Sequence, residues 1–553
     1  MASASSRLLA GMLFGTALML PARAEPPGPS VVEWREDLAF ILDTLVEVHP
    51  DPFARVTQGE LRAAASALDA DLPGLEQHQI VGRLIELVAL VADGHTSLQP
   101  TGKYGFRGWF PLRFYDFEDG LFVIVARPSQ ADLIGSEVLR VGGFTAKEAL
   151  ARVMRLVAAD NLHGKRSDAG LFLSSPDALH ALGIIDASDA LELELKTPAG
   201  DTRSVTVERI DGEYGISWFW RANGGPPESK YVTAFAAEET PLHLRHQTPY
   251  TDIYWFEYLK ASGTLFCQIS GFWDHGDESF GEFNRRMWNA VDRHRPRRFV
   301  LDVRYHGGGD GGMVNQLVHE FIKREWLNRE GQIFVIMGRR TFSSAVMAVG
   351  AMKGHTQAIF VGEPMAAGLN HFGDSRSFSL PNSGMDLDVS SLYWQVGHPA
   401  DTSRTFSPQV PAVPRSEDYF AGRDPALSAI LQDRARTVPQ LFRTAGSKAA
   451  LEGYEAMREA NPGIGWWQPF SWDEINLVGY EFLAAKRLAD ARAAFRLNTR
   501  VYPTKWEVWD SLGEACMESG QFEEARAHYR HSLELNPGNY NAVEMLERLA
   551  SPP

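Results

Sequence analysis

The segment from Phe299 to Met352 constrains the fold more than any other part of the chain. It contains two apolar runs, 299–303 and 333–337, and each is followed by a loop and then by a helix-like segment. Similar apolar runs occur at 265–269 and 358–361. Continuous apolar runs that alternate with helices are typical of a parallel sheet covered on both faces. The sequence therefore predicts an α/β sheet at the centre of the protein.

Two loops of different chemistry follow the runs 299–303 and 333–337. One contains Gly307, Gly308 and Gly309, whose backbone N–H groups can approach a bound carbonyl without a Cβ in the way. The other brings Ser343 and Ser344 to the start of a helix, where the helix dipole favours developing negative charge. Because parallel strands end at one edge of a sheet, we expect the loops to form one crevice suited to acyl transfer. The alternative for Ser343 is an ordinary helix N-cap.

Length and charge narrow the classes of function. With 553 residues, the chain exceeds one hydrophobic core, so we expect several domains. The net charge of -16 argues against a nucleic-acid partner, because phosphate binding needs clustered lysine and arginine. Cys267 and Cys516 lie far apart in the sequence and are expected to be free thiols. No Cys/His cluster has zinc spacing, and no cofactor or metal is implied.

Residues 1–24 have the features of an export signal. Arg7 precedes an apolar stretch, 8–20, that is too short for a membrane span, and Ala22-Arg23-Ala24 fits a cleavage site. The alternative is a buried N-terminal helix. No later run of about 18 apolar residues follows, so no membrane span is expected after cleavage. We therefore expect an exported protein, periplasmic or secreted.

The rest of the chain divides into four segments. Residues 31–95 repeat apolar positions at three- and four-residue steps and predict a helical bundle. Residues 105–210 are mostly strand and turn, and 211–430 contain the α/β pattern together with a linking stretch at its start. Residues 440–553 predict an α-helical tail.

The tail contains an internal repeat. Gly479 and Gly513 lie 34 residues apart, and so do Pro503 and Pro537. A repeat of 34 residues with small residues between helices and proline at the end of each unit is typical of tetratricopeptide repeats. We expect this tail to bind a protein partner through its concave face.

The central segment resembles the S41-type serine peptidases, which include the tail-specific or C-terminal processing peptidases and a tricorn-like branch. These carry a D-L-R-x-N-x-G-G loop and a T-x-S nucleophile turn, and here the matching runs are Asp302-Val-Arg-Tyr-His-Gly-Gly-Gly309 and Thr341-Phe-Ser343. The resemblance extends over roughly 31–430. It implies a ClpP- or crotonase-like core sheet and a PDZ-like module within 105–210.

The same resemblance implies roles for individual residues. Ser343 is the expected nucleophile, and the N–H groups of Ser344 and of Gly308 or Gly309 are the expected oxyanion hole. The implied activity is cleavage of peptide bonds in a peptide or protein substrate, through an acyl-enzyme and without a cofactor. In the processing peptidases a lysine serves as base, but Gly368 stands at that position here.

A histidine is therefore the expected base. The tricorn-like branch takes it from a turn ahead of the sheet domain, and His95 in Asp93-Gly-His-Thr96 matches that placement. His371 and His306 are alternatives as base or binding residue, and Asp401 is a candidate for the acid that orients the base. The other hypothesis for the whole chain is a non-catalytic protein on an S41 scaffold that binds peptides or hydrophobic ligands, with a partner on its tail.

Overall fold

The computed structural model describes most of the chain, namely residues 28–213, 231–236, 239–247, 253–276, 278–460 and 469–550. The predicted export signal and part of the predicted linking stretch lie outside the described residues. Among the described helices, none combines the length and the apolar character that crossing a lipid bilayer requires.

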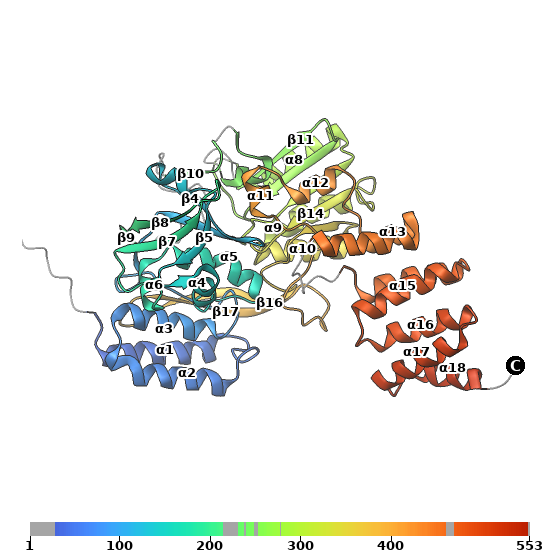
Figure 1. The fold of residues 1–553 in the computed structure, drawn as a ribbon, viewed down its shortest axis with the longest axis horizontal. Coiled ribbons are helices and arrows are strands. Elements are labelled where there is room, and N and C mark those ends of the chain that lie inside the picture. The colour runs from blue at the N-terminus through green and yellow to red at the C-terminus, as the bar shows by residue number, and fades with distance from the viewer. Residues whose placement is uncertain are drawn as a thin grey trace, which may run out of the picture.

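A six-stranded sheet forms the centre of the molecule (Figure 1). Its order is β11-β12-β13-β14-β15-β18, and only β11 runs antiparallel to its neighbour. The strands are β11 (Tyr254–Leu259), β12 (Thr264–Ile269), β13 (Arg298–Asp302), β14 (Ile333–Met337), β15 (Ile359–Gly362) and β18 (Val410–Pro411). The predicted parallel α/β sheet is thus present.

Helices cover both faces of this sheet. One face packs under α8 (Phe280–His294), α9 (Gly312–Ile322) and α10 (Ser344–His355), and the other packs against α12 (Pro425–Leu431). The side chains of β13 and β14 are buried on both faces, which explains why residues 299–301 and 333–337 are continuously apolar. Arg298 and Asp302, at the two ends of β13, are buried charged residues.

Three helices precede the first strands, as the helical periodicity predicts. They are α1 (Val31–Val48), α2 (Gln58–Asp71) and α3 (Gln77–Ala89). Ser30 and Thr57 close capping boxes with Glu33 and Glu60, and each box fixes where a helix begins.

A second, antiparallel sheet follows these helices and shares one hydrophobic core with them. Its strands are β3 (Leu112–Phe117), β4 (Gly120–Ala126), β5 (Glu137–Val141), β6 (Phe144–Thr145), β7 (Ala190–Lys196), β8 (Thr202–Glu208) and β10 (Val232–Thr233). The helices α4 (Ala146–Val153), α5 (Leu162–Leu173) and α6 (Pro176–Ala181) belong to the same region, and β2 (Arg107–Trp109) pairs with β9 (Ile210–Glu213) beside it. The PDZ-like character of this region stays a prediction.

A long hairpin leaves the central sheet and joins the N-terminal part of the chain. Its strands β16 (Asn370–Ser379) and β17 (Asp386–Gln395) pair with each other, and β17 also pairs with β1 (Ser97–Gln99). At the tip of the hairpin, the buried carboxylate of Asp37 accepts the N–H groups of Asn382 and Ser383. The hairpin therefore carries residues of the second half of the chain to the turn that follows α3.

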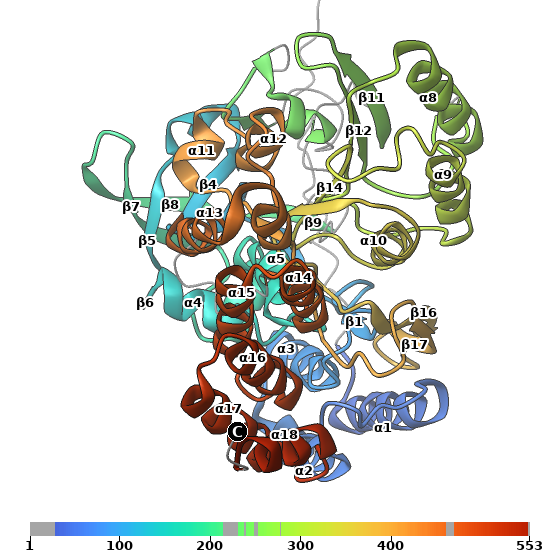
Figure 2. The ribbon, with the colours of Figure 1, turned by 90° about the vertical axis from the view of Figure 1, so that its right-hand side faces the viewer.

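The C-terminal tail is helical and has its own core (Figure 2). It comprises α13 (Val438–Ala460), α14 (Trp472–Ala484), α15 (Leu488–Val501), α16 (Trp506–Glu518), α17 (Phe522–Leu535) and α18 (Tyr540–Ala550). A Cβ on Gly479 would lie 2.4 Å from the ring of Phe495, and one on Gly513 would lie 2.9 Å from the ring of Tyr529. At these two positions, 34 residues apart, the repeat therefore places a glycine where an aromatic ring packs against the preceding helix.

Candidate active site

The glycine loop and the serine turn follow the carboxyl ends of two neighbouring parallel strands, β13 and β14. Hydrogen bonds connect the two loops. The Thr341 hydroxyl donates to the carbonyl of Val303 (2.9 Å), and the N–H of Phe342 donates to the carbonyl of His306 (3.1 Å). The two loops that the sequence places at one sheet edge therefore form a single unit.

Ser343 has an unusual backbone conformation at the start of α10. Its φ is +57° and its ψ is -126°, a region that L-residues other than glycine rarely occupy. Its side chain makes no capping hydrogen bond, so Ser343 does not act as the ordinary N-cap considered from the sequence. A serine on a strained turn between a strand and a helix presents its hydroxyl outward, as nucleophiles of α/β hydrolases do.

Only glycine fits beside this serine. A Cβ on Gly308, whose φ is +130°, would lie 2.8 Å from the Cβ of Ser343. A Cβ on Gly309, whose φ is +124°, would lie 2.3 Å from the carbonyl oxygen of Phe272. Both positions combine a left-handed backbone with close contact, so the loop needs glycine for geometry and for space.

The three expected oxyanion donors differ in their availability. The N–H of Gly308 donates to Nδ1 of His306 at 3.1 Å and is therefore engaged. For the N–H groups of Gly309 and Ser344, the described part of the chain offers no hydrogen-bond acceptor. These two N–H groups are the donors that a bound oxyanion can reach.

A cleft of about 440 Å³ opens above the two loops. It is lined by His95, Gly309, Asp310, Gly311, Gly312, Ser343, Ser344, Met347, His371, Gly373, Asp374 and Trp394. Residues from the sheet edge, the turn after α3 and the hairpin β16–β17 thus meet in one place. Of the residues singled out from the sequence, Gly308, His306 and Asp401 are not among those that line it.

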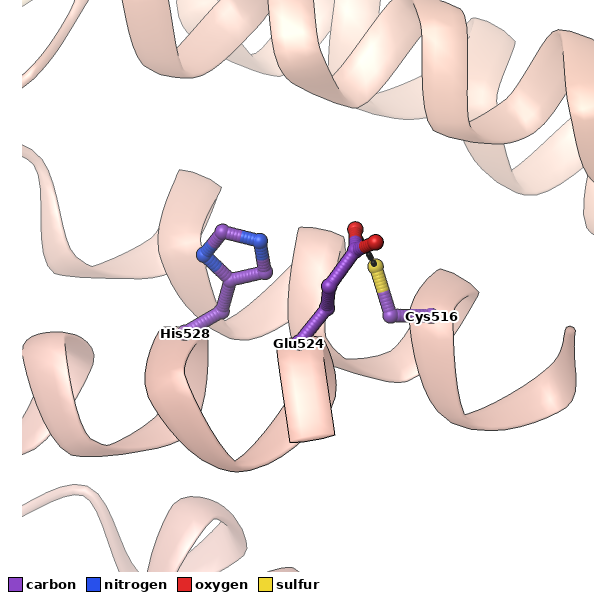
Figure 3. Close-up of side chains that lie close together, drawn as sticks. All are labelled: Cys516, Glu524 and His528. Atoms are coloured by element: carbon purple, nitrogen blue, oxygen red, sulfur yellow. Dashed lines mark hydrogen bonds between the residues drawn. The ribbon is translucent and has the colours of Figure 1, made fainter. Parts of the chain in front are cut away.

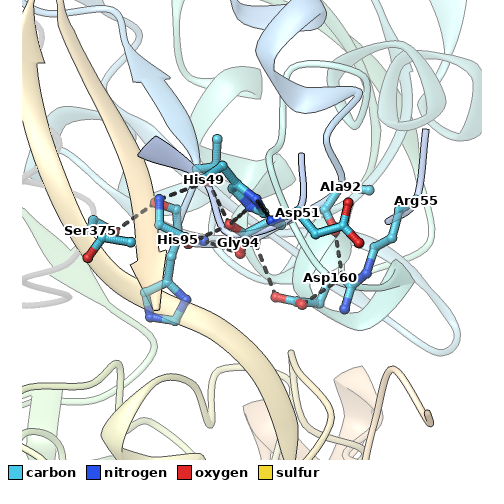
Figure 4. Close-up of polar contacts among 12 residues, drawn as sticks. His49, Asp51, Arg55, Ala92, Gly94, His95, Asp160 and Ser375 are labelled. Carbon is cyan, nitrogen blue, oxygen red and sulfur yellow. Dashed lines mark hydrogen bonds and ion pairs between the residues drawn. The ribbon is translucent and has the colours of Figure 1, made fainter. Parts of the chain in front are cut away.

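His95 enters the cleft from the turn after α3, and its ring points away from that turn (Figure 4). The ring stacks on Phe342, with centroids 4.3 Å apart, and its Nδ1 atom is buried without a hydrogen-bond partner among the described residues. Burial lowers the pKa of His95, and the charges of Asp93 and Asp374 oppose this shift. His95 is therefore neutral near pH 7, the form in which an imidazole can accept a proton.

His371 reaches the same cleft from β16. Its Nδ1 lies 3.1 Å from the carbonyl oxygen of Leu369, which leaves Nε2 as the acceptor nitrogen. Its ring centroid is 5.9 Å from that of His95. Burial is the main cause that lowers the pKa of His371, and electrostatic repulsion by His95 lowers it further. Two neutral histidines thus line the cleft beside Ser343.

His306 has a different environment. Its side chain is fully buried against Phe272, and burial lowers its pKa to about 3. Because Nδ1 accepts the N–H of Gly308, the His306 ring stabilises the conformation of the glycine loop. Its position is that of a structural residue of the loop.

The Ser343 hydroxyl makes no hydrogen bond with any described residue. Hydrogen bonds between catalytic groups are often long in an empty site and shorten when substrate binds. Ser343, His95 and His371 therefore line one cleft without a hydrogen bond between the serine and either histidine.

A carboxylate that the sequence does not single out also lines the cleft. Asp374 follows Gly373 on β16 and has a φ of +52°. Its charge acts on His95, whereas Asp401 accepts the N–H of Ser403 at 2.9 Å in a loop away from the cleft. The sequence does not reveal that Asp374 has a positive φ. Its place in the cleft is therefore seen only in the folded hairpin.

A separate cluster in the tail contains Cys516, Glu524 and His528 (Figure 3). Their potential ligand atoms lie within 4.8 Å of one another. The carboxylate of Glu524 already binds the guanidinium of Arg496 at 2.7 Å, so its charge is balanced without an ion. Cys516 and Cys267 are both buried free thiols, as expected.

Solved structures show which fold this chain has. Mature CPAF complexed with lactacystin matches at 14% identity with a TM-score of 0.52, covering 74% of this chain and 99% of that chain. Mature CPAF matches at 13% identity with a TM-score of 0.51, covering 75% and 99%. The C-terminal processing protease of photosystem II D1 also matches, at 14% identity with a TM-score of 0.33, covering 73% and 97%.

Residues 506–539 match the tetratricopeptide repeat family, and no curated protein gives a significant match to the chain. The likeness to CPAF confirms the expected architecture but, at this identity, not the activity. The chain has a fold like that of mature CPAF, with a tetratricopeptide repeat in its C-terminal tail.

Proposed function

We propose that this chain is a serine peptidase in which Ser343 is the nucleophile and His95 the general base. The observation that carries the proposal is the position of Ser343. It stands on a strained turn, in a cleft that it shares with a neutral histidine and two free N–H donors. These are the three components of acyl transfer to a hydroxyl.

The chemistry follows from this arrangement. His95 takes the proton of the Ser343 hydroxyl as its oxygen attacks the carbonyl carbon of the scissile peptide bond. The N–H groups of Gly309 and Ser344 donate to the resulting oxyanion, and the amino end of α10 adds its dipole. His95 then returns the proton to the leaving amine, and a water molecule hydrolyses the acyl-enzyme by the same steps.

The packing around Gly368 argues against a lysine base at that position. At Gly368, where the processing peptidases have lysine, a Cβ would lie 1.9 Å from the carbonyl oxygen of Ser403. No side chain can be accommodated there without moving the backbone. A histidine base is therefore the alternative consistent with this packing.

Labelling with a fluorophosphonate probe tests the nucleophile. The purified chain should be labelled on Ser343, the variant Ser343→Ala should not be labelled, and Ser262→Ala, in a turn remote from the cleft, should behave as the parent. Absence of labelling in the parent, beside an active control hydrolase, would contradict the proposal.

Two matched histidine variants test the base. We expect His95→Gln to slow labelling by about 100-fold or more, since general bases contribute 10²–10⁴-fold. We expect His371→Gln to slow it far less, because it is the ring of His95 that stacks on Phe342, the residue directly before Ser343. The reverse order would assign the base to His371.

The second candidate function is non-catalytic binding of a peptide or hydrophobic ligand. It is favoured by the unbonded Ser343 hydroxyl and by Met347 and Trp394 in the cleft wall. Saturable binding of a peptide without labelling or cleavage would support it.

Location and partners complete the proposal. The signal-like residues 1–24 support an exported protein, periplasmic or secreted, that acts on peptide or protein substrates. The tetratricopeptide repeat supports a protein partner on the tail.

A further inference from the structure

The turn that carries His95 is fixed by two buried carboxylates, Asp93 and Asp160. Figure 4 shows Asp160 beside this turn, together with His49 and Arg55. Both side chains are fully buried. A buried carboxylate is costly unless hydrogen bonds and an opposite charge compensate it. The hydrogen-bond partners of Asp93 and Asp160 therefore show which parts of the chain these carboxylates hold in place.

Asp93 joins three elements. It accepts hydrogen bonds from Nε2 of His49 (3.2 Å) at the end of α1, from the hydroxyl of Thr96 (2.6 Å) and from the hydroxyl of Ser390 (2.5 Å) on β17. It also accepts the backbone N–H of His95 itself, at 3.0 Å. One carboxylate thus connects the first helix, the turn and the hairpin.

His49 is itself oriented for this contact. The N–H of Asp51 donates to its Nδ1 at 3.1 Å, so Nδ1 is the acceptor nitrogen and Nε2 carries the proton that faces Asp93. The ring also lies against Phe372 of β16, with centroids 4.6 Å apart. The His49–Asp93 pair is therefore a defined unit with one tautomer.

Asp160 holds the other side of the turn. It accepts the N–H of Gly94 (3.1 Å) and the guanidinium of Arg55 (2.7 Å), and Arg55 also donates to the carbonyl of Ala92 (2.6 Å). Ala92 has a φ of +56°, which these bonds maintain. The backbone on both sides of His95 is therefore fixed, and the carbonyl of His95 also accepts the hydroxyl of Ser375.

We propose that Asp93, supported by His49, is a positioning residue that fixes the place and orientation of the His95 imidazole beside Ser343. The proposal rests on the peptidase function proposed above. Asp93 acts through the backbone of His95 and does not line the cleft, so it is not itself a catalytic residue.

The charges around His95 make the proposal measurable. Asp93 and Asp374 both raise the pKa of His95 against the effect of burial, and His371 is the neighbouring titratable ring. Removing the charge of Asp93 should therefore lower the pH at which His95 titrates. A carboxylate that only stabilises the fold elsewhere would not change that pH.

The experiment compares Asp93→Asn with Asp37→Asn. Asp37 is equally buried and also bonds two backbone N–H groups of the hairpin, but it has no contact with the His95 turn. Two readouts are used for the full chain: the rate of fluorophosphonate labelling, and the ¹⁵N-histidine titration of His95, assigned with His95→Gln. Circular dichroism checks that each variant is folded.

We expect Asp93→Asn to be labelled about 100-fold more slowly than Asp37→Asn, since small displacements of a catalytic group can cost this much. His95 should also titrate at lower pH in Asp93→Asn. Labelling within threefold of Asp37→Asn together with an unchanged His95 titration would overturn the proposal. If Asp93→Asn does not fold, Ser390→Ala, which removes one bond to Asp93, should still slow labelling by about tenfold.

A parent chain that is not labelled at all contradicts the peptidase function, and the titration then decides the positioning role alone. In that case a lower titration pH for His95 in Asp93→Asn supports the close coupling of Asp93 to the imidazole that the positioning role requires, and an unchanged one overturns the proposal.

Discussion

The ring of His95 lies against the ring of Phe342, with centroids 4.3 Å and planes 25° apart. Phe342 directly precedes Ser343 in the chain, so one aromatic contact connects the candidate base with the candidate nucleophile. Gly94 makes room for this contact, because a Cβ there would lie 2.7 Å from the Phe342 ring. The turn after α3 and the turn before α10 therefore fit each other through a glycine and a phenylalanine.

Phe342→Ala should reduce the rate of Ser343 labelling by about fivefold. The expected cause is the loss of an aromatic contact worth about 1 kcal/mol, which lets the His95 ring rotate away. Phe378→Ala, on the far part of the hairpin, is the control. Equal labelling rates in the two variants would show that the stacking does not orient His95.

The sequence predicted the elements that depend on local pattern. The apolar runs at 299–303 and 333–337 gave the two central strands to within one residue, because buried parallel strands need continuous apolar side chains. The glycines at 479 and 513 marked helix contacts for a steric reason that acts within one repeat. The serine turn was likewise recognisable from consecutive residues.

Features that depend on distant pairing were not predictable. Asp374 enters the cleft because β17 pairs with β1, almost three hundred residues earlier in the chain. The N-terminal helices and the antiparallel sheet, treated as separate segments from the sequence, share one core. The engagement of the Gly308 N–H by His306 depends on a side-chain orientation that no sequence pattern encodes.

Gly308→Ala should abolish labelling of Ser343 while the chain remains folded. The new Cβ would meet the Cβ of Ser343 at 2.8 Å on a backbone with φ +130°, which costs on the order of 1–3 kcal/mol and displaces the serine. Labelling and circular dichroism measure the two effects. Normal labelling in this variant would mean that the loop can shift without disturbing the site.

The rate of Ser343 labelling should rise as the pH is raised and should reach its plateau before pH 7. Burial holds the pKa of His95 below its ordinary value of about 6.5, so the neutral base is fully formed at pH 7. The midpoint of the rate profile should therefore lie below about 6.5. A midpoint well above 7 would instead indicate a base other than a buried histidine.

Acid should destabilise the protein in part through His306. Burial lowers its pKa to about 3, so the unfolded chain takes up the proton first, and stability present above about pH 6.5 is lost as the pH falls. At pH 5 this loss amounts to about 2 kcal/mol. His306→Asn keeps an acceptor for the Gly308 N–H but does not titrate.

The measurement is the drop in Tm between pH 7 and pH 5, which should be smaller in His306→Asn than in the parent. Some loss should remain, because burial also lowers the pKa of His163 and of His243 to about 4. An identical drop in both proteins would show that His306 is not kept neutral by the fold.

Restoring the lysine of the processing peptidases should not restore their mechanism. In Gly368→Lys the first side-chain carbon would lie 1.9 Å from the carbonyl oxygen of Ser403, so the loop must move before any amine can reach Ser343. We expect a lower Tm and loss of labelling, and the same lower Tm in Gly368→Ala, because the Cβ alone causes the clash. Gly354→Ala, in α10 with open space around it, is the matched control and should not lower Tm. If Gly368→Lys instead retained Tm and gained a labelling profile with a higher midpoint pH, the packing at Gly368 would not be what separates this chain from the lysine-dependent peptidases.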